Sequence, residues 1–220
     1  MYWNKQVLYI IFIIVSAHCC KYYKRNPFVL ETRSHLAIII LARGGSKGIE
    51  LKNIATIDGV SLLAISLKHI KKVDDIDSIW VSTDHFKILE EADKENVNVH
   101  WRSAASATDT ATSVEGVTEF LNHHSEVDIL GLIQCTSPFI SSKHIEKAVN
   151  FMRSGEECIF SVTRSHQLLW TELDNKLIPV NFNPNKRPRR QDWDGDLVEN
   201  GMFYFATRQL IEKGLLQTTK

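Results

Sequence analysis

Residues 36–53 read LAIIILARGGSKGIELKN, and this stretch decides the fold. The apolar run Leu36–Leu41 leads directly into the segment RGGSKG at residues 43–48, and Lys52-Asn53 follow shortly after. Glycines let a backbone turn tightly and bring its N–H groups close to phosphate oxygens, while Arg and Lys add cationic donors. We therefore predict a buried strand followed by a loop that holds a nucleoside triphosphate.

The spacing of this loop excludes two common nucleotide-binding motifs. It matches neither the P-loop pattern G-x-x-x-x-G-K-[ST] nor the dinucleotide pattern G-x-G-x-x-G. A tight turn without a ligand is the alternative, and two glycines alone would favour it. The basic residues on both sides of the glycines favour phosphate binding, in the manner of sugar nucleotidyltransferases.

Helical and strand patterns alternate along the rest of the chain. Apolar spacing predicts helices over Val60–Val73, Phe86–Glu95, Ser113–His123 and Ser141–Arg153, the last with Ser141 and Ser142 as caps, and strands over Ser78–Thr83, Val97–His100, Asp128–Gln134 and Cys158–Thr163. This alternation predicts an α/β fold with a doubly wound, mostly parallel sheet. Ligands bind at the carboxyl ends of such strands, where the glycine loop, Asp84 and Gln134 all follow.

Residues 164–199 depart from this alternation. They lack a clean period and contain Pro179, Pro184 and Pro188. We predict that this stretch forms an excursion from the sheet within a single catalytic domain, residues 36–220.

Composition excludes some partners. Lys+Arg and Asp+Glu number 26 each, so no overall field draws the chain to nucleic acid. Four cysteines are too few for a disulfide scaffold. Cys135 and Cys158 lie in strand-like apolar runs, which predicts buried free thiols.

Residues 1–30 differ in kind from the rest. Lys5 precedes the apolar run Val7–Ala17, which is short for a membrane span and predicts a signal peptide or a short signal anchor. The alternative is a β-strand of the fold. Export to the secretory pathway would follow from a signal, although Lys21, Lys24 and Arg25 lie after the run and favour a cytosolic body.

Four separated motifs carry a resemblance to a known family. ARGGSKGI-x-LKN, VSTDH (81–85), IQCTSP (133–138) and NPNKRPRRQDWDGDLVENGMFYF (183–205) resemble the CMP-N-acylneuraminate (CMP-sialic acid) synthetases of animals, from Leu36 to about Leu216. The resemblance implies a nucleotidyltransferase, Rossmann-like fold. It implies transfer of CMP from CTP to the anomeric hydroxyl of sialic acid, release of pyrophosphate and a need for Mg²⁺. It also implies a homodimer or higher homo-oligomer, with residues 164–199 forming contacts between subunits and reaching over the active site. The N-terminal segment, read as a signal, predicts a secretory, Golgi location.

The resemblance also assigns site residues. Arg43 and Lys52 would be catalytic; Gly44, Gly45, Ser46, Asn53, Arg102 and Ser113 would bind nucleotide; Gln134, Arg190, Asn200 and Tyr204 would bind the sugar acid. The alternatives are a solvated surface lysine for Lys52, an amide bonded to local backbone for Gln134, and a half-buried strand aromatic for Tyr204. No histidine stands at a convincing spacing for a general base.

The chain departs from the family pattern in three places. Glu50 replaces a proline, and Leu169 replaces a residue that tends to be basic. The family's acidic Asp-x-Asp segment, which holds magnesium, is missing before the chain ends at Lys220. The metal ligands are therefore unknown, and two functions stay open: an active enzyme, or a shortened form that binds CTP or pairs with full-length subunits.

Two further alternatives concern acceptor and location. Related enzymes activate other keto-sugar acids such as KDO, and residues 186–201 favour sialic acid over these. The basic run Lys186–Arg190 could act as a nuclear localisation patch if the N-terminal segment is not a signal. Membrane attachment is expected through that N-terminal segment only.

Overall fold

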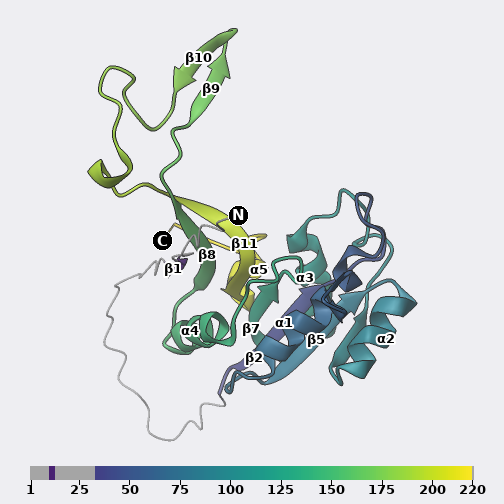
Figure 1. The fold of residues 1–220 in the computed structure, drawn as a ribbon. Helices are drawn as coiled ribbons and strands as arrows, with labels where there is room; N and C mark the ends of the chain where they lie inside the picture. The colour runs from purple at the N-terminus through teal and green to yellow at the C-terminus, as the bar shows by residue number, and fades with distance from the viewer. Residues whose placement is uncertain (1–9, 13–32, 220) are drawn as a thin grey trace, which may run out of the picture. The chain divides into compact units, whose positions relative to one another are not determined.

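The computed structural model describes residues 10–12 and 33–219 (Figure 1). Two compact units divide the chain: a larger unit of Ile13–Phe160 with Gly201–Lys220, and a smaller unit of Met1–Phe12 with Ser161–Asn200. The chain passes from the larger to the smaller unit within strand β8 (Cys158–Ser165) and returns within β11 (Asp196–Thr207).

The larger unit is built on a mostly parallel sheet. Its strand order is β8-β11-β7-β2-β5-β6, with β2 at His35–Leu41, β5 at Ser78–Thr83, β6 at Asn98–Trp101 and β7 at Val127–Ile133. β2 pairs in parallel with β5 and with β7, and β5 pairs in parallel with β6. β11 is antiparallel to β7. The α/β prediction with a mostly parallel sheet is confirmed.

Helices bury both faces of this sheet. They are α1 (Leu62–Ile70), α2 (Phe86–Lys94), α3 (Ser113–His123), α4 (Ser142–Arg153) and α5 (Arg208–Ile211). Phe120 of α3 and Leu210 of α5 pack with Ile39 and Leu132 in one core cluster. Ile38 lies on the opposite face and has no exposed surface. Because α1 contacts both α2 and α4, these three helices account for the second layer.

Two predicted helix starts were wrong in detail. Residues predicted to open a helix at Val60 instead form a short hairpin, β3 (Thr56–Ile57) with β4 (Val60–Ser61), before α1 begins. Asp58 and Gly59 turn it with φ of 49° and 78°, and the Asp-Gly pair was the overlooked signal. Ser61 then caps α1, its Oγ accepting from the Ala64 amide at 3.0 Å. Ser141 stands at the N-cap of α4, but its side chain makes no capping hydrogen bond.

The smaller unit holds the stretch predicted as an excursion. A hairpin joins β9 (Trp170–Leu173) to β10 (Lys176–Pro179), and a short 3-10 helix, η2, covers Arg190–Asp192. Asp174 and Asn175 turn the hairpin with positive φ. A role of residues 164–199 in dimer formation stays a prediction.

Part of the predicted signal segment is a strand. β1 (Ile10–Phe12) pairs antiparallel with Ser161–Thr163 of β8, which is the alternative that the sequence disfavoured. The remainder of residues 1–30 lies outside the described residues. Among the described residues, no helix is both long and apolar enough to span a membrane.

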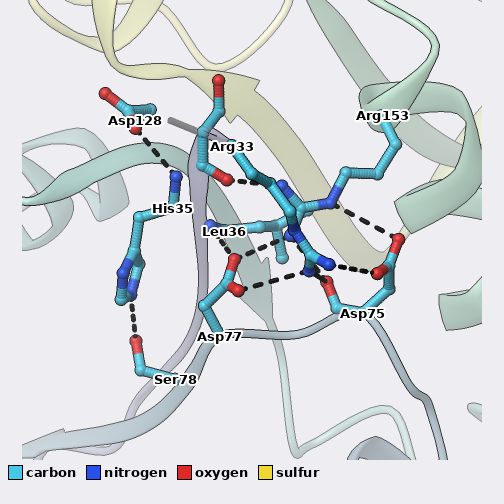
Figure 2. A network of polar contacts seen from close by, with 9 residues as sticks. Arg33, His35, Leu36, Asp75, Asp77, Ser78, Asp128 and Arg153 are labelled. Carbon is cyan, nitrogen blue, oxygen red and sulfur yellow. Dashed lines mark hydrogen bonds and ion pairs between the residues drawn. The ribbon is translucent and has the colours of Figure 1, made fainter. Parts of the chain in front are cut away.

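A polar network fixes the amino ends of the central strands (Figure 2). Asp77, just before β5, accepts from the Leu36 amide at 2.7 Å and from Arg153 Nη2 at 2.7 Å. Arg33 adds a contact to Asp77 at 3.2 Å. His35 Nε2 lies 2.8 Å from Ser78 Oγ, and the His35 amide donates to Asp128 at 2.8 Å. This network ties β2, β5, β7 and the end of α4 together at the edge opposite the strand ends that carry the loops.

The Asp77 carboxylate is the hub of this network, and its protonation should weaken the fold. Burial opposes its ionisation, but the hydrogen bonds from Leu36 and Arg153 and the charges of Arg153 and Arg33 outweigh burial, so its pKa lies below the ordinary 3.8. The resulting stabilisation is complete above pH 3.8 and is lost as the pH falls through the lower folded pKa.

We expect Asp77→Asn to lower the free energy of unfolding by about 1–3 kcal/mol at pH 7, because buried donors lose an ionised acceptor. Urea unfolding followed by circular dichroism measures this change. Asp74→Asn is the matched control, since Asp74 is exposed and has no partner among the described residues. Equal stability of the two variants would contradict the role given to Asp77.

Candidate nucleotide site

A cavity of about 480 Å³ opens at the carboxyl ends of the parallel strands. The residues that line it follow β2, β6 and β7 or begin α3. Seven of the predicted site residues line this one cavity: Arg43, Ser46, Lys52, Asn53, Arg102, Ser113 and Gln134. Positions spread over about 90 residues of sequence therefore meet at one edge of the sheet, as the rule for such sheets requires.

The segment that follows β5 holds the glycine loop in place. The Gly44 amide donates to Asp84 Oδ1 at 2.8 Å. A Cβ atom at Gly44 would lie 2.7 Å from the His85 ring, so only glycine fits there. The amides of Gly45, Lys47 and Gly48 donate to no residue in the part of the chain that the structure describes. These three N–H groups remain available to an anion.

Two cations of the loop are bound to one carboxylate. Arg43 Nη1 lies 2.9 Å from Asp109 Oδ1, and Lys47 Nζ lies 2.6 Å from Asp109 Oδ2. Arg43 Nη1 also donates to the Thr108 carbonyl at 2.6 Å. The hydrogen bond and charge of Lys47, with those of Arg43, outweigh the opposing effect of burial and lower the pKa of Asp109. A triphosphate bound here would share or replace these contacts.

Lys52 and Asn53 sit at the next turn of the chain and differ in role. Lys52 is exposed at the cavity rim, and its ammonium has no ion pair among the described residues. Asn53 is 6% exposed; its Nδ2 donates to the Arg43 carbonyl at 3.1 Å, and its Oδ1 accepts from Cys135 Sγ at 3.3 Å. Asn53 thus ties the glycine loop to the segment after β7.

Arg102 and Ser113 form the opposite wall. Arg102 follows β6 and is 5% exposed, with Nε donating to Ser106 Oγ at 3.1 Å and Nη2 donating to the Ser106 carbonyl. Its Nη1 has no partner in the described ranges. Ser113 opens α3, directly after Thr112, whose side chain caps the helix together with Glu115.

Gln134 directly follows β7, and its side chain lies beside Gly201. The Gln134 amide donates to the Met202 carbonyl at 3.1 Å, so β11 fixes its backbone. A Cβ atom at Gly201, where φ is 67°, would lie 3.5 Å from Gln134 Oε1. The side-chain amide makes no hydrogen bond to the described part of the chain. The structure therefore does not show the alternative in which this amide bonds to nearby backbone groups.

Five predicted site residues do not line the cavity: Gly44 and Gly45 of the glycine loop, and Tyr204, Asn200 and Arg190. Tyr204 packs against the core cluster under α3, and in the sheet it lies opposite Leu132 of β7. This is the position expected of a half-buried strand aromatic, which was the alternative for Tyr204. Asn200 belongs to the smaller unit, where it accepts from Ser161 Oγ at 2.6 Å and donates to Thr163 Oγ1 at 3.1 Å. Arg190 also belongs to the smaller unit, is exposed, and has no partner in the described ranges, whereas Arg189 binds Asp192.

Two carboxylates of the site were missed by the sequence analysis. Asp109 pairs with the loop cations, and Glu119 of α3 accepts hydrogen bonds from Ser103 and Ser106. The polar run at residues 108–113 offered a signal for Asp109. Glu119 sits one helical turn from Glu115 in an ordinary amphipathic pattern, and nothing in that pattern marks it.

The described residues do not form a carboxylate site for Mg²⁺. No group of three or more His, Cys, Asp or Glu side chains in residues 10–12 and 33–219 is arranged to hold a metal ion. Asp84 and Asp109 are occupied by Gly44 and by the loop cations. Hard divalent cations need several oxygen ligands, which this set does not supply.

Comparison with known proteins identifies the family of the chain and finds structures with a similar fold. A cytidylyltransferase family profile matches residues 37–219. The chain belongs to the cytidylyltransferase family. It is 44% identical over 191 residues to N-acylneuraminate cytidylyltransferase A of Danio rerio, which covers 84% of this chain and 44% of that protein. N-acylneuraminate cytidylyltransferase of Oncorhynchus mykiss is 43% identical over 188 residues, with coverage of 83% and 44%.

Solved structures of low identity share the fold. CMP:2-keto-3-deoxy-manno-octonic acid synthetase complexed with CTP aligns with a TM-score of 0.61 at 18% identity, covering 82% of this chain and 77% of that one. A 4-diphosphocytidyl-2C-methyl-D-erythritol synthase from Anaerococcus prevotii aligns with a TM-score of 0.60 at 18% identity, covering 85% and 78%. The chain itself spans less than half the length of the curated relatives it matches.

The predicted buried thiols are confirmed, and their reactivity follows. Burial raises the pKa of Cys135 to about 12 and also raises that of Cys158. The thiolate is the reactive form, so both should resist iodoacetamide in the native protein at pH 8 and react fully in urea. Peptide mass spectrometry measures the alkylated fraction at each site. Rapid native labelling of Cys135 would contradict its burial beneath the cavity.

Proposed function

We propose that this chain is an N-acylneuraminate cytidylyltransferase, which converts CTP and a sialic acid to CMP-sialic acid and pyrophosphate. The observation that carries the proposal is the identity of 43–44% to animal proteins of that name across 83–84% of the chain. The cavity supports it by bringing together cations and free amides at one strand edge.

The charges of the cavity suit a triphosphate. Arg43, Lys47 and Lys52 stand on the loop side with the free amides of Gly45, Lys47 and Gly48. Phosphoryl transfer depends on positioning and on stabilising charge as the leaving group departs. We assign Arg43 and Lys52 to the triphosphate, with Arg102 and Ser113 on the opposite wall for the nucleoside.

The bond changes follow from the substrates. The anomeric oxygen of the sialic acid forms a bond to the α-phosphorus of CTP, and the bond from that phosphorus to the bridging oxygen breaks. Pyrophosphate leaves with the electron pair, and the anomeric hydroxyl loses its proton. No side chain in the cavity is assigned as the base. Lys52, which has no ion pair in the described ranges, can stabilise the charge that develops on pyrophosphate.

Mg²⁺ would enter this proposal only with the nucleotide. The described carboxylates do not form a metal site, so we assign no protein ligand and route no step through the ion. Hard cations bind triphosphate oxygens readily.

For the sugar acid we propose Gln134 and Arg190 as contacts. The side-chain amide of Gln134 has no hydrogen-bond partner in the described ranges and lies beside Gly201, and the Arg190 guanidinium has no partner in the described part of the smaller unit. A guanidinium can bind a carboxylate through two parallel hydrogen bonds. Asn200 would act by fixing β11 to β8, and Tyr204 by packing in the core.

We also propose a homodimer and a secretory, Golgi location. The smaller unit exposes Trp170, Leu173 and Leu177, which suits contact with a second subunit. Strand β1 includes Ile10–Phe12, so cleavage of a signal after Ala17 would remove a strand of the smaller unit. A nuclear location through Lys186–Arg190 remains the alternative.

Lys52 provides the first test. We expect Lys52→Ala to lower kcat/KM for CTP by about 100-fold, because it removes a positive charge that stabilises the leaving pyrophosphate. Pyrophosphate release with CTP and N-acetylneuraminate measures this, and Lys68→Ala, an exposed lysine of α1, is the control.

The same assay separates the functional alternatives. Turnover by the 220-residue chain supports the enzyme. CTP binding without turnover supports the alternative of a catalytically impaired form that binds CTP. Faster turnover with KDO than with N-acetylneuraminate would reassign the acceptor, and absence of CTP binding would overturn the proposal.

Arg190 provides a test of acceptor binding. We expect Arg190→Ala to raise KM for N-acetylneuraminate by about tenfold while KM for CTP stays within twofold, because the lost contact is a charge-assisted carboxylate pair. Arg187→Ala, which removes an exposed neighbour of the same type, serves as the control. An equal effect of both variants would point to general charge rather than a specific contact.

A further inference from the structure

Arg102 is a buried cation without a direct carboxylate partner. It is 5% exposed, yet each hydrogen bond that its guanidinium makes within the described ranges goes to Ser106. Burial lowers the pKa of Arg102, whereas the charges of Glu119 and Asp84 oppose that decrease. A buried charge held by neutral groups needs those groups to be fixed in place.

Ser106 is fixed by Glu119. The Ser106 hydroxyl donates to Glu119 Oε2 and accepts from Arg102 Nε at 3.1 Å, so one oxygen joins the two charges. Glu119 also accepts from the Ser103 amide at 2.8 Å and from Ser103 Oγ at 3.1 Å. The carboxylate therefore holds both ends of the turn at residues 103–106 that carries the contacts to Arg102.

The Glu119 carboxylate is ionised in this position. Burial opposes its ionisation, but the hydrogen bonds from Ser106 and Ser103 and the nearby His100 outweigh burial, so the pKa lies below the ordinary value. His100 Nε2 is 3.9 Å from Glu119 Oε1 and has no hydrogen bond in the described ranges. The carboxylate oxygens of Glu119 thus accept hydrogen bonds mainly from the turn at residues 103–106.

Helix α3 also makes room for the guanidinium. A Cβ atom at Gly116 would lie 2.8 Å from Arg102 Nη2 and 2.9 Å from Leu41 Cδ1. Glycine is less favourable than alanine inside a helix, and here it allows Arg102 to lie against the helix. Gly116 and Glu119, three residues apart on α3, therefore both act on Arg102.

We propose that Glu119 is a positioning residue that holds Arg102 in the nucleotide cavity through Ser103 and Ser106. That Arg102 contacts the nucleotide rests on the proposed function. The position of Arg102 itself does not depend on it. Glu119 does not line the cavity and acts through the turn.

The first measurement observes Arg102 directly. In the full chain labelled with ¹⁵N-arginine, the Nε–H signal of Arg102 is assigned by its loss in Arg102→Lys. We expect Glu119→Gln to speed exchange of this proton with water by about tenfold, because Ser106 is no longer held. Ser106→Ala should have the same effect. Glu90→Gln, an exposed glutamate of α2, should leave it unchanged.

The second measurement is a double-mutant cycle on CTP affinity, determined by calorimetry. We expect Glu119→Gln to weaken CTP about tenfold when Arg102 is present and less than twofold in an Arg102→Ala background. A residue that merely stabilises the fold would weaken CTP equally in both backgrounds.

The outcomes are distinct. Unchanged Nε–H exchange in both Glu119→Gln and Ser106→Ala would overturn the proposal, as would equal loss of CTP affinity in the two backgrounds. If the wild-type chain binds no CTP while the Nε–H signal responds as expected, the positioning role stands and the proposed function fails.

Discussion

The burial of the five central residues of β2 is the constraint on which the larger unit depends. Leu36 to Ile40 have no exposed surface, and parallel partners on both sides satisfy the strand's backbone. A strand buried on both faces requires helices on both faces, which the alternating sequence supplies. The network around Asp77 and Arg153 fixes the amino ends of the strands, so their carboxyl ends present the loops from a rigid edge (Figure 2).

At that edge the cavity holds its cations in two different ways. Arg43 and Lys47 are paired with Asp109 in a setting where solvent screens the charges, so the contacts are weak and exchangeable. Arg102 is buried and held by a turn that a second carboxylate fixes. The loop side can thus adapt to a flexible triphosphate, whereas the opposite wall is set before any ligand binds. Prior ordering reduces the entropy that binding would otherwise cost.

The sequence predicted the parts of this arrangement that local patterns determine. Strand β5, helix α3 and the strand-end position of the glycine loop follow from apolar periodicity, and the sheet rule brought Arg43, Arg102 and Gln134 to one cavity. Local patterns failed where a side chain's role depends on its neighbours in space. Tyr204 packs against the core cluster from β11, and its sequence context does not distinguish such packing from ligand contact.

Carboxylates show the same limit most clearly. Sequence motifs single out the cations and glycines of an anion site because their spacing within one loop is fixed by the ligand. The acids that hold those cations come from other elements: Asp109 lies 66 positions from Arg43, and Glu119 acts on Arg102 from a helix surface whose pattern is ordinary. No short motif constrains such pairs, because any element that the fold brings near can supply the charge. The cations of an anion site can therefore be predicted from sequence. The carboxylates that position those cations cannot be predicted in the same way.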